Sequence, residues 1–187
     1  MIIGLSGYAQ SGKDTVAKFL VENHGFERVA FADPIRDLLY ELNPIVSFEI
    51  AARPLDLKYI VDRDGWDKAK KDPEIRRLLQ VLGTGARDII DDSIWIIKAL
   101  RTMSGDGNYV ITDVRFQNEA DTLRLSGHGA QIWRVERDGV KAVNSHVSEH
   151  DLDGWEFDAY IHNNATIEDL EFAVKNMLMA SASSRKG

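Results

Sequence analysis

The sequence has 187 residues, of which 44% are apolar, and it carries a formal net charge of -7 with no cysteine. This length suits one domain with room for an inserted lobe, and the lack of cysteine excludes disulfides and thiolate metal sites. The acidic balance argues against long nucleic acid as a partner, because a general attraction to phosphate requires positive charge.

The first residues read MIIGLSG and lack the apolar core of a signal peptide. No apolar run approaches the length of a membrane span. We therefore expect a protein of a reducing cytoplasm that has no membrane partner.

Apolar runs alternate with helical patterns along most of the chain. Strands are expected at 2–6, 28–32, 109–114, 131–136 and 159–162. Helices are expected from Lys13 to about Gly25, from Pro34, over 74–82, over 89–101, from about 116, and after Thr166. Gly83 and Gly85 are expected to interrupt the helical stretch that contains them. This alternation predicts an α/β fold, in which a parallel sheet lies between two layers of helices.

The regular alternation breaks down after the second helix, where residues 43–71 contain two prolines, many charges and scattered apolar residues. We interpret residues 1–180 as a single domain that carries an inserted, mainly helical region at 43–104. Residues 137–151 are a candidate lid over the site, and residues 181–187 are expected to form a disordered tail.

The segment GYAQSGKDT follows the first expected strand and fits the pattern G-x-x-x-x-G-K at Gly7, Gly12 and Lys13. Glycines let backbone N–H groups surround phosphate oxygens, and the following helix adds its positive N-terminal end. The lysine reaches the terminal phosphates of a nucleoside triphosphate. The segment therefore predicts an ATP site, and the alternative is a glycine-rich turn without a ligand.

Other residues of the same loop complete the expected ATP site. Asp14 stands where Ser or Thr normally binds Mg²⁺, and a carboxylate is a suitable hard-oxygen ligand. Thr15 is placed to donate its hydroxyl to the α-phosphate, and Ser11 lies within the loop.

A second carboxylate, Asp113, ends the apolar strand in YVITDVRF, the usual position of an acid that orients Mg²⁺ or accepts a proton. Arg115 lies two residues further on. The alternatives are a helix cap for Asp113 and a surface ion pair with Glu119 for Arg115. We expect the catalytic set to be Lys13, Asp14, Asp113 and Arg115, with Asp14 and Asp113 as the metal ligands.

Several other side chains are candidates for binding nucleotides. Guanidinium groups match phosphate oxygens in shape and charge. The candidates for an acceptor phosphate are Arg36, Arg76, Arg77 and Arg87. Trp66 and Trp95 are candidates for stacking on a base, and Arg134 and Arg137 for closing over ATP. For each arginine the alternative is a solvated surface position, and for each tryptophan it is the apolar core.

The chain resembles the phage-type deoxynucleoside monophosphate kinases, a branch of the P-loop nucleotide kinases. The matching segments run from Gly7 to about Glu171. They are GYAQSGKDTVA, FADPIR, GWDKAK, IRRLLQVLGTGARD, IW at 94–95, TDVRFQNEA, SHVSEHD and NNATIEDLE. The combination of RRLLQVLGT with DVRFQNEA is much more specific than GKDT alone.

The resemblance implies Mg²⁺-dependent transfer of the γ-phosphoryl group of ATP to a deoxynucleoside 5′-monophosphate, and a five-stranded sheet in the order 2-3-1-4-5. It also implies a bacteriophage origin, the cytoplasm of a bacterial host and a homodimer. Its ATP-binding residues are Gly12, Lys13, Asp14 and Thr15. Its acceptor-binding residues are Asp33, Arg36, Arg77, Arg87, Trp95, Asp113, Arg115 and Glu119.

Two alternatives to this function stay open at this point. One is another P-loop small-molecule kinase similar to dephospho-coenzyme A kinase. The other is a nucleotide-binding module that performs no chemistry.

Overall fold

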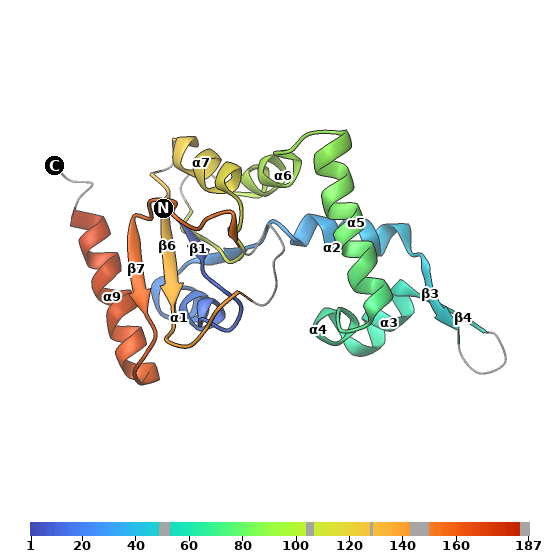
Figure 1. Cartoon of the computed structure of the whole chain (residues 1–187), viewed down its shortest axis with the longest axis horizontal. Coiled ribbons are helices and arrows are strands. Elements are labelled where there is room, and N and C mark those ends of the chain that lie inside the picture. The colour runs from blue at the N-terminus through green and yellow to red at the C-terminus, as the bar shows by residue number, and fades with distance from the viewer. Residues whose placement is uncertain (49–52, 104–106, 128, 143–149, 184–187) are drawn as a thin grey trace. The chain divides into compact units, whose positions relative to one another are not determined.

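The computed structural model describes residues 1–48, 53–103, 107–127, 129–142 and 150–183. The chain divides into two units, and we describe each by itself (Figure 1). The first unit combines Met1–Ala30 with Leu100–Gly187, and the second is Phe31–Ala99.

The first unit is built on a sheet of five parallel strands. In chain order these are β1 (Ile2–Ser6), β2 (Glu27–Val29), β5 (Tyr109–Ile111), β6 (Gln131–Glu136) and β7 (Ala159–His162). Their order across the sheet is β2-β5-β1-β6-β7. When only the strands of this sheet are numbered, the order is 2-3-1-4-5, as the resemblance implies. β2 and β5 are shorter than expected, so Asp113 lies just beyond the end of β5.

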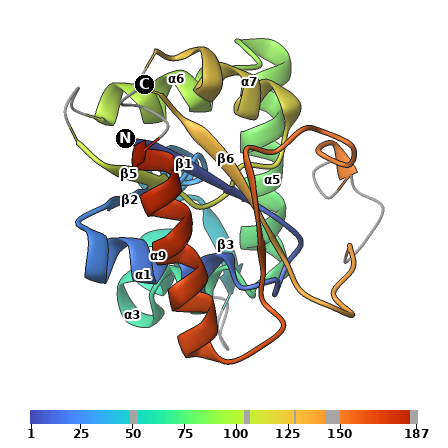
Figure 2. The same ribbon diagram turned by 90° about the vertical axis from the view of Figure 1, so that its left-hand side faces the viewer.

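Helices cover both faces of this sheet, as expected (Figure 2). On one face, α1 (Lys13–His24) and α9 (Ile167–Ser183) bury a core that includes Ile3, Leu5 and Leu20 of the first half of the chain. On the other face lies α7 (Gln117–Leu125), with Leu123 beside Gly4 of β1. Alternate residues of β1 thus face opposite helical layers, as strand geometry requires.

The last helix starts as predicted but extends further than predicted. The Thr166 hydroxyl accepts the N–H of Asp169, which is the expected cap. The helix continues to Ser183, and the Ser181 hydroxyl donates to Gln131 at 2.6 Å. The disordered tail predicted from residue 181 is therefore wrong for 181–183, and residues 184–187 lie outside the described range. None of the helices in the described part of the chain has both the length and the apolar composition that a bilayer crossing requires.

The second unit has its own small core, formed by Leu39, Val46, Leu57, Ile60, Val61, Ala69 and Ile75. Its helices are α2 (Asp33–Leu42), α3 (Leu57–Asp64), α4 (Trp66–Ala69), α5 (Pro73–Ile89) and most of α6 (Ile94–Thr102). An antiparallel hairpin, β3 (Ile45–Phe48) with β4 (Pro54–Asp56), was not expected from the sequence. Its residues lack the strict alternation that would have predicted strands.

The expected interruption at Gly83 and Gly85 is wrong, because α5 runs through both glycines without a break. Gly83 is buried, and a side chain there would press against the end of Ile35. The Gly83 carbonyl also accepts the indole N–H of Trp95 at 3.0 Å. Glycine weakens a helix by about 1 kcal/mol but does not end it where packing holds the backbone in place.

This difference between the two glycines is testable. Replacing Gly85 with Ala should raise the free energy of unfolding by about 0.5–1 kcal/mol, because the site is helical and a Cβ there meets open space. Urea denaturation followed by circular dichroism measures the change. Gly83→Ala is the matched control and should gain less, because the Ile35 side chain would have to move. Equal gains at both positions would contradict the packing described for Gly83.

Candidate active site

The loop between β1 and α1 adopts a conformation that depends on two glycines. Gly7 has φ +135° and Gly12 has φ +109°, values that L side chains rarely adopt. A Cβ on Gly7 would overlap the carbonyl oxygen of Val135, and one on Gly12 would overlap the side-chain amide of Asn163. Both glycines are therefore required by close packing as well as by backbone geometry.

Asn163, directly after β7, braces this loop from outside. Its side-chain amide donates to the Ser11 carbonyl at 2.9 Å, and its backbone N–H donates to the Glu136 carbonyl at 2.7 Å. The loop is thus tied to the carboxyl ends of β6 and β7. Asn163 was not singled out from the sequence, since no local pattern distinguishes it from the neighbouring asparagine.

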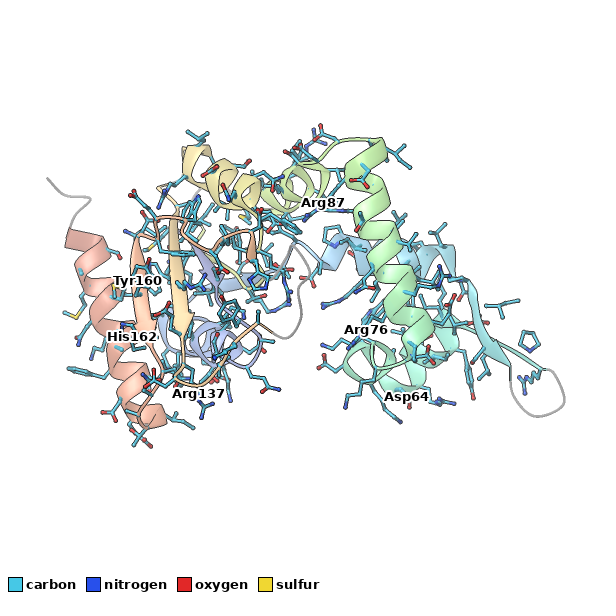
Figure 3. The ribbon with its side chains drawn as sticks, in the orientation of Figure 1. Asp64, Arg76, Arg87, Arg137, Tyr160 and His162 are labelled. Atoms are coloured by element: carbon cyan, nitrogen blue, oxygen red, sulfur yellow. The ribbon has the colours of Figure 1, made fainter. Side chains whose placement is uncertain are left out.

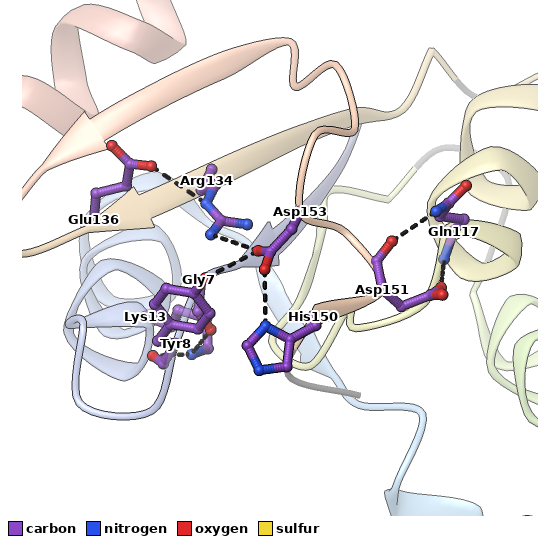
Figure 4. A network of polar contacts seen from close by, with 9 residues as sticks. All are labelled: Gly7, Tyr8, Lys13, Gln117, Arg134, Glu136, His150, Asp151 and Asp153. Carbon is purple, nitrogen blue, oxygen red and sulfur yellow. Dashed lines mark hydrogen bonds and ion pairs between the residues drawn. The ribbon is translucent and has the colours of Figure 1, made fainter. Parts of the chain in front are cut away.

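Lys13 begins α1 and turns its side chain back along the loop. Its ammonium group donates to the carbonyls of Gly7 at 2.6 Å and Tyr8 at 2.8 Å (Figure 4). Two carbonyl acceptors fix the positive charge at the mouth of the loop, beside the N-terminal end of the helix. An ammonium group and a helix N-terminus both favour the negative charge that the phosphates of a nucleoside triphosphate carry.

The loop also contains a buried hydroxyl that suits a phosphate ligand. The Ser11 side chain is buried, and its Oγ has no hydrogen-bond partner among the described residues. A buried hydroxyl without a partner is costly unless a ligand or water satisfies it. Together with the Gly7–Gly12 loop and the Lys13 ammonium, it fits a polyphosphate.

The two predicted metal ligands follow neighbouring parallel strands. Asp14 is exposed in the first turn of α1, and Asp113 follows β5, which pairs with β1. Mg²⁺ in phosphoryl-transfer sites takes one or two carboxylates, and phosphates and water supply its other ligands. The number of carboxylates matches that requirement, and within the described ranges no group of three or more His, Asp or Glu side chains is placed to hold a metal.

Glu119 has a structural task that the sequence did not predict. Its side chain is only 1% exposed, and Oε2 accepts the backbone N–H groups of Arg115 at 2.7 Å and Phe116 at 3.1 Å. It therefore shapes the turn that carries Arg115 and begins α7. Because the cap of α7 lies at Phe116, the helix-cap alternative for Asp113 is wrong.

A pocket opens beside the first residues of the loop. It is lined by Ser6, Gly7, Tyr8, Ala9, Val114, Arg115, Arg134 and Leu152. Two arginines thus meet at the phosphate loop, and of the lining residues only Gly7, Arg115 and Arg134 were candidates from the sequence.

Asp153 connects this pocket to the loop (Figure 4). Its carboxylate accepts the Tyr8 hydroxyl at 2.9 Å and the Arg134 guanidinium at 3.5 Å, and it contacts His150 Nδ1 at 2.9 Å. Burial raises the pKa of the Tyr8 phenol, and Asp153 reinforces the shift. Burial alone would raise the pKa of Asp153, but bonds from His150 and Tyr8 and the Arg134 charge outweigh it, so this pKa is lowered.

The remaining acceptor candidates lie in the second unit, and each has a local environment there. Arg36 pairs with Asp33 at 2.9 Å, and Arg77 pairs with Glu74 at 2.7 Å. Arg76 and Arg87 project from different turns of α5 (Figure 3). Trp95 is 5% exposed and is held by its bond to Gly83, so its ring is part of that unit's interior.

Arg137, the candidate for closing over ATP, directly follows β6 and is exposed (Figure 3). Its carbonyl accepts the N–H of Val140, which forms a tight turn. The candidate lid at 137–151 is described only at 137–142 and 150–151, and its central part, 143–149, lies outside the described residues.

The fold and the loop define a class of protein. A parallel sheet in the order 2-3-1-4-5 has, after its central strand, a glycine loop that binds a lysine at the start of a helix. An acidic residue follows the adjacent strand β5. This combination defines a P-loop nucleotide-binding protein.

Comparison with known proteins identifies the group within that class. The sequence model described as deoxynucleotide monophosphate kinase matches residues 1–67 and 65–174. The chain belongs to the deoxynucleotide monophosphate kinase family.

Named relatives span nearly the whole chain. The mimivirus of Acanthamoeba polyphaga has a relative of this name that is 31% identical over 90% of this chain and 91% of its own. The deoxynucleotide monophosphate kinase of Enterobacteria phage T4 is 26% identical over 95% of this chain and 98% of its own. A solved structure of dephospho-CoA kinase from Campylobacter jejuni covers 98% of both chains at 12% identity with a TM-score of 0.47, too distant for its acceptor to inform this site.

The packing around the loop leads to a mutational prediction. Gly7→Ala should weaken ATP binding at least about tenfold, because the new Cβ overlaps the Val135 carbonyl and must displace the loop. Isothermal titration calorimetry with ATP measures the loss. Gly25→Ala is the control, because Gly25 also has a positive φ but a Cβ there meets open space. Unchanged ATP affinity in Gly7→Ala would contradict the loop geometry.

The lowered pKa of Asp153 predicts a pH dependence of stability. A depressed folded-state pKa means that ionised Asp153 stabilises the fold fully above the usual pKa of 3.8 and loses this effect as pH falls below it. The stability difference between the wild type and Asp153→Asn should therefore shrink as the pH falls below about 4. Chemical denaturation across this range measures it. A difference that stays constant down to about pH 3 would show that Asp153 is not stabilised as a carboxylate.

Proposed function

We propose that this protein transfers the γ-phosphoryl group of ATP to a deoxynucleoside 5′-monophosphate and yields ADP and the deoxynucleoside diphosphate. The observation that carries this proposal is the phosphate loop with the Lys13 ammonium bound at its mouth, in a chain that belongs to the deoxynucleotide monophosphate kinase family. The loop supports ATP as the phosphoryl donor, and family membership supports a deoxynucleoside monophosphate as the acceptor.

The transfer needs no proton removal by the protein. An oxygen of the acceptor phosphate attacks the γ-phosphorus as the bond to the β,γ-bridging oxygen breaks, and ADP leaves with that electron pair. Lys13, on the mouth of the loop, stabilises the negative charge that moves to the leaving oxygen. The backbone N–H groups of the loop and the Ser11 hydroxyl hold the donor phosphates in line.

Asp14 and Asp113 are the proposed holders of Mg²⁺, directly or through water. When bound, the ion neutralises charge between the donor phosphates. Asp14 is exposed and therefore accessible to a ligand, and Asp113 follows the neighbouring strand β5. Thr15, in the first turn of α1, is the proposed contact to the α-phosphate, and Arg137 is the proposed closing arginine.

The proposed acceptor-binding residues are those that the resemblance implies, taken unit by unit. Arg115 contributes from the first unit, where Glu119 fixes its backbone. In the second unit the proposed contacts are Asp33, Arg36, Arg77 and Arg87, whereas the buried position of Trp95 argues against its stacking on a base. Arg36 pairs with Asp33 in a half-buried ion pair and Arg77 pairs with Glu74 in an exposed one, so a phosphate contact would replace an existing ion pair at either arginine. A homodimer, a cytoplasmic location and the lack of a long nucleic acid partner stay part of this proposal.

Family membership favours this function over a kinase of the dephospho-coenzyme A type. A nucleotide-binding module without chemistry is also disfavoured, because Lys13 at the loop and Asp113 after the neighbouring strand are groups that phosphoryl transfer uses.

The test compares wild-type protein with Lys13→Ala. A coupled ADP-release assay across the deoxy- and ribonucleoside monophosphates should show activity with one or more deoxynucleotides. Lys13→Ala should lower kcat at least about a hundredfold, because the variant lacks the ammonium group that stabilises negative charge on the leaving oxygen. Lys18→Ala, on the outer face of the same helix with its side chain 66% exposed, is the control and should match wild type. Wild-type turnover in Lys13→Ala, or activity only with coenzyme or sugar acceptors, would refute the assignment.

A further inference from the structure

The pocket beside the loop is formed entirely within the first unit. It borders Gly7 and Tyr8, whose carbonyls bind the Lys13 ammonium. A group in this pocket would therefore contact the same two residues of the loop that bind the Lys13 ammonium.

The pocket is suited to an anion attached to a less polar body. Arg115 and Arg134 both line it, and guanidinium groups bind phosphate through paired N–H donors. Val114 and Leu152 supply apolar wall on the same pocket. A free inorganic anion would need only the arginines, whereas a nucleotide would use both kinds of surface.

Arg134 is held more firmly than a surface arginine. Its side chain is 12% exposed, its Nε donates to Glu136 at 3.3 Å and its Nη2 to Asp153 at 3.5 Å. The guanidinium carbon also lies 5.0 Å from the Tyr8 ring centroid and 5.1 Å from that of Phe157. A guanidinium fixed by two acids and two rings has already lost the freedom that binding would otherwise remove.

Asp153 links this arginine to the loop. The Tyr8 hydroxyl and the Arg134 guanidinium bind the same carboxylate oxygen, Oδ1. Any movement of the loop at Tyr8 therefore shifts the acid that orients Arg134. The two bonds from Arg134, at 3.3 Å and 3.5 Å, use two of its five N–H groups, so other N–H donors of the guanidinium can bind a ligand.

We propose that Arg134 is a binding residue for the phosphate of the acceptor nucleotide, alongside Arg115, and that Asp153 is the positioning residue that orients it. The inference rests on the proposed function and deepens it. It also changes the expected role of Arg134, which the sequence suggested would close over ATP. The pocket touches the first half of the loop, Gly7 to Ala9, and not the Gly12–Thr15 segment that receives the donor.

The competing explanation is that Arg134 only fixes the chain around Asp153 and Phe157. The two explanations differ in what Arg134→Lys should change. Lysine keeps the charge but lacks the fork of N–H donors, so a phosphate contact would weaken. A purely structural role would lower thermal stability and leave affinity for the phosphate group unchanged.

The experiment measures binding of the four common deoxynucleoside 5′-monophosphates to the full chain by isothermal titration calorimetry. The corresponding deoxynucleosides, which lack the phosphate, are titrated in parallel. Arg134→Lys should weaken the preferred monophosphate about ten- to a hundredfold, since hydrogen bonds to charged groups are worth that ratio. Affinity for the deoxynucleoside and for ATP should change less than about twofold. Asp153→Asn should weaken the monophosphate by a smaller factor, because the arginine remains but is less well oriented.

Arg124→Lys is the matched control. Arg124 is also stacked on an aromatic ring, Trp155 at 4.0 Å, and paired with an acid, Asp158 at 3.1 Å, but it does not line the pocket. This variant should lower the melting temperature and leave monophosphate affinity unchanged.

Three outcomes would overturn the inference. They are equal losses for monophosphate and deoxynucleoside in Arg134→Lys, a loss confined to ATP, and a wild-type protein that binds none of the four monophosphates. Turnover is measured separately. If the monophosphate binds through Arg134 but ADP is not released, the inference stands and the proposed function fails.

Discussion

The phosphate loop can take its shape only because two positions in it have no side chain. The Val135 carbonyl lies where a Cβ of Gly7 would be, and the Asn163 amide lies where a Cβ of Gly12 would be. Both neighbours come from the ends of β6 and β7, so the loop depends on those strands lying on one side of β1. The conformation of the proposed donor loop therefore depends on the order of strands in the sheet as well as on the two glycines.

The same edge of the sheet concentrates charge of both signs. Lys13 and two arginines lie at the loop, and Asp14 and Asp153 lie beside it. Asp153 and Arg134 are partners, which lowers the cost of holding these half-buried charges away from water. Asp153 accepts a bond from the Arg134 guanidinium beside the pocket, whereas Asp14 and Asp113 stay the proposed Mg²⁺ ligands.

The sequence predicted best what depends on neighbours along the chain. The loop, its lysine and the strands at 131–136 and 159–162 follow from local patterns, and the sheet order followed from the resemblance. What it missed depends on distant contacts. Gly83 does not end α5 because Ile35 and Trp95 hold it, and Tyr8 meets an acid 145 positions away. The acceptor residues of the second unit stay predictions, since their roles depend on a ligand as much as on the chain.

The parallel pairing of β1 also constrains the order in which the parts of the chain can fold during synthesis. β1 is the first strand synthesised, yet its two neighbours in the sheet are β5 and β6, which begin at Tyr109 and Gln131. β1 therefore has no strand to pair with in the sheet until the whole of the second unit has been synthesised. That unit closes its own core through nearer contacts, such as the β3–β4 hairpin. During synthesis the inserted unit can thus become structured before the nucleotide-binding unit that encloses it in the sequence.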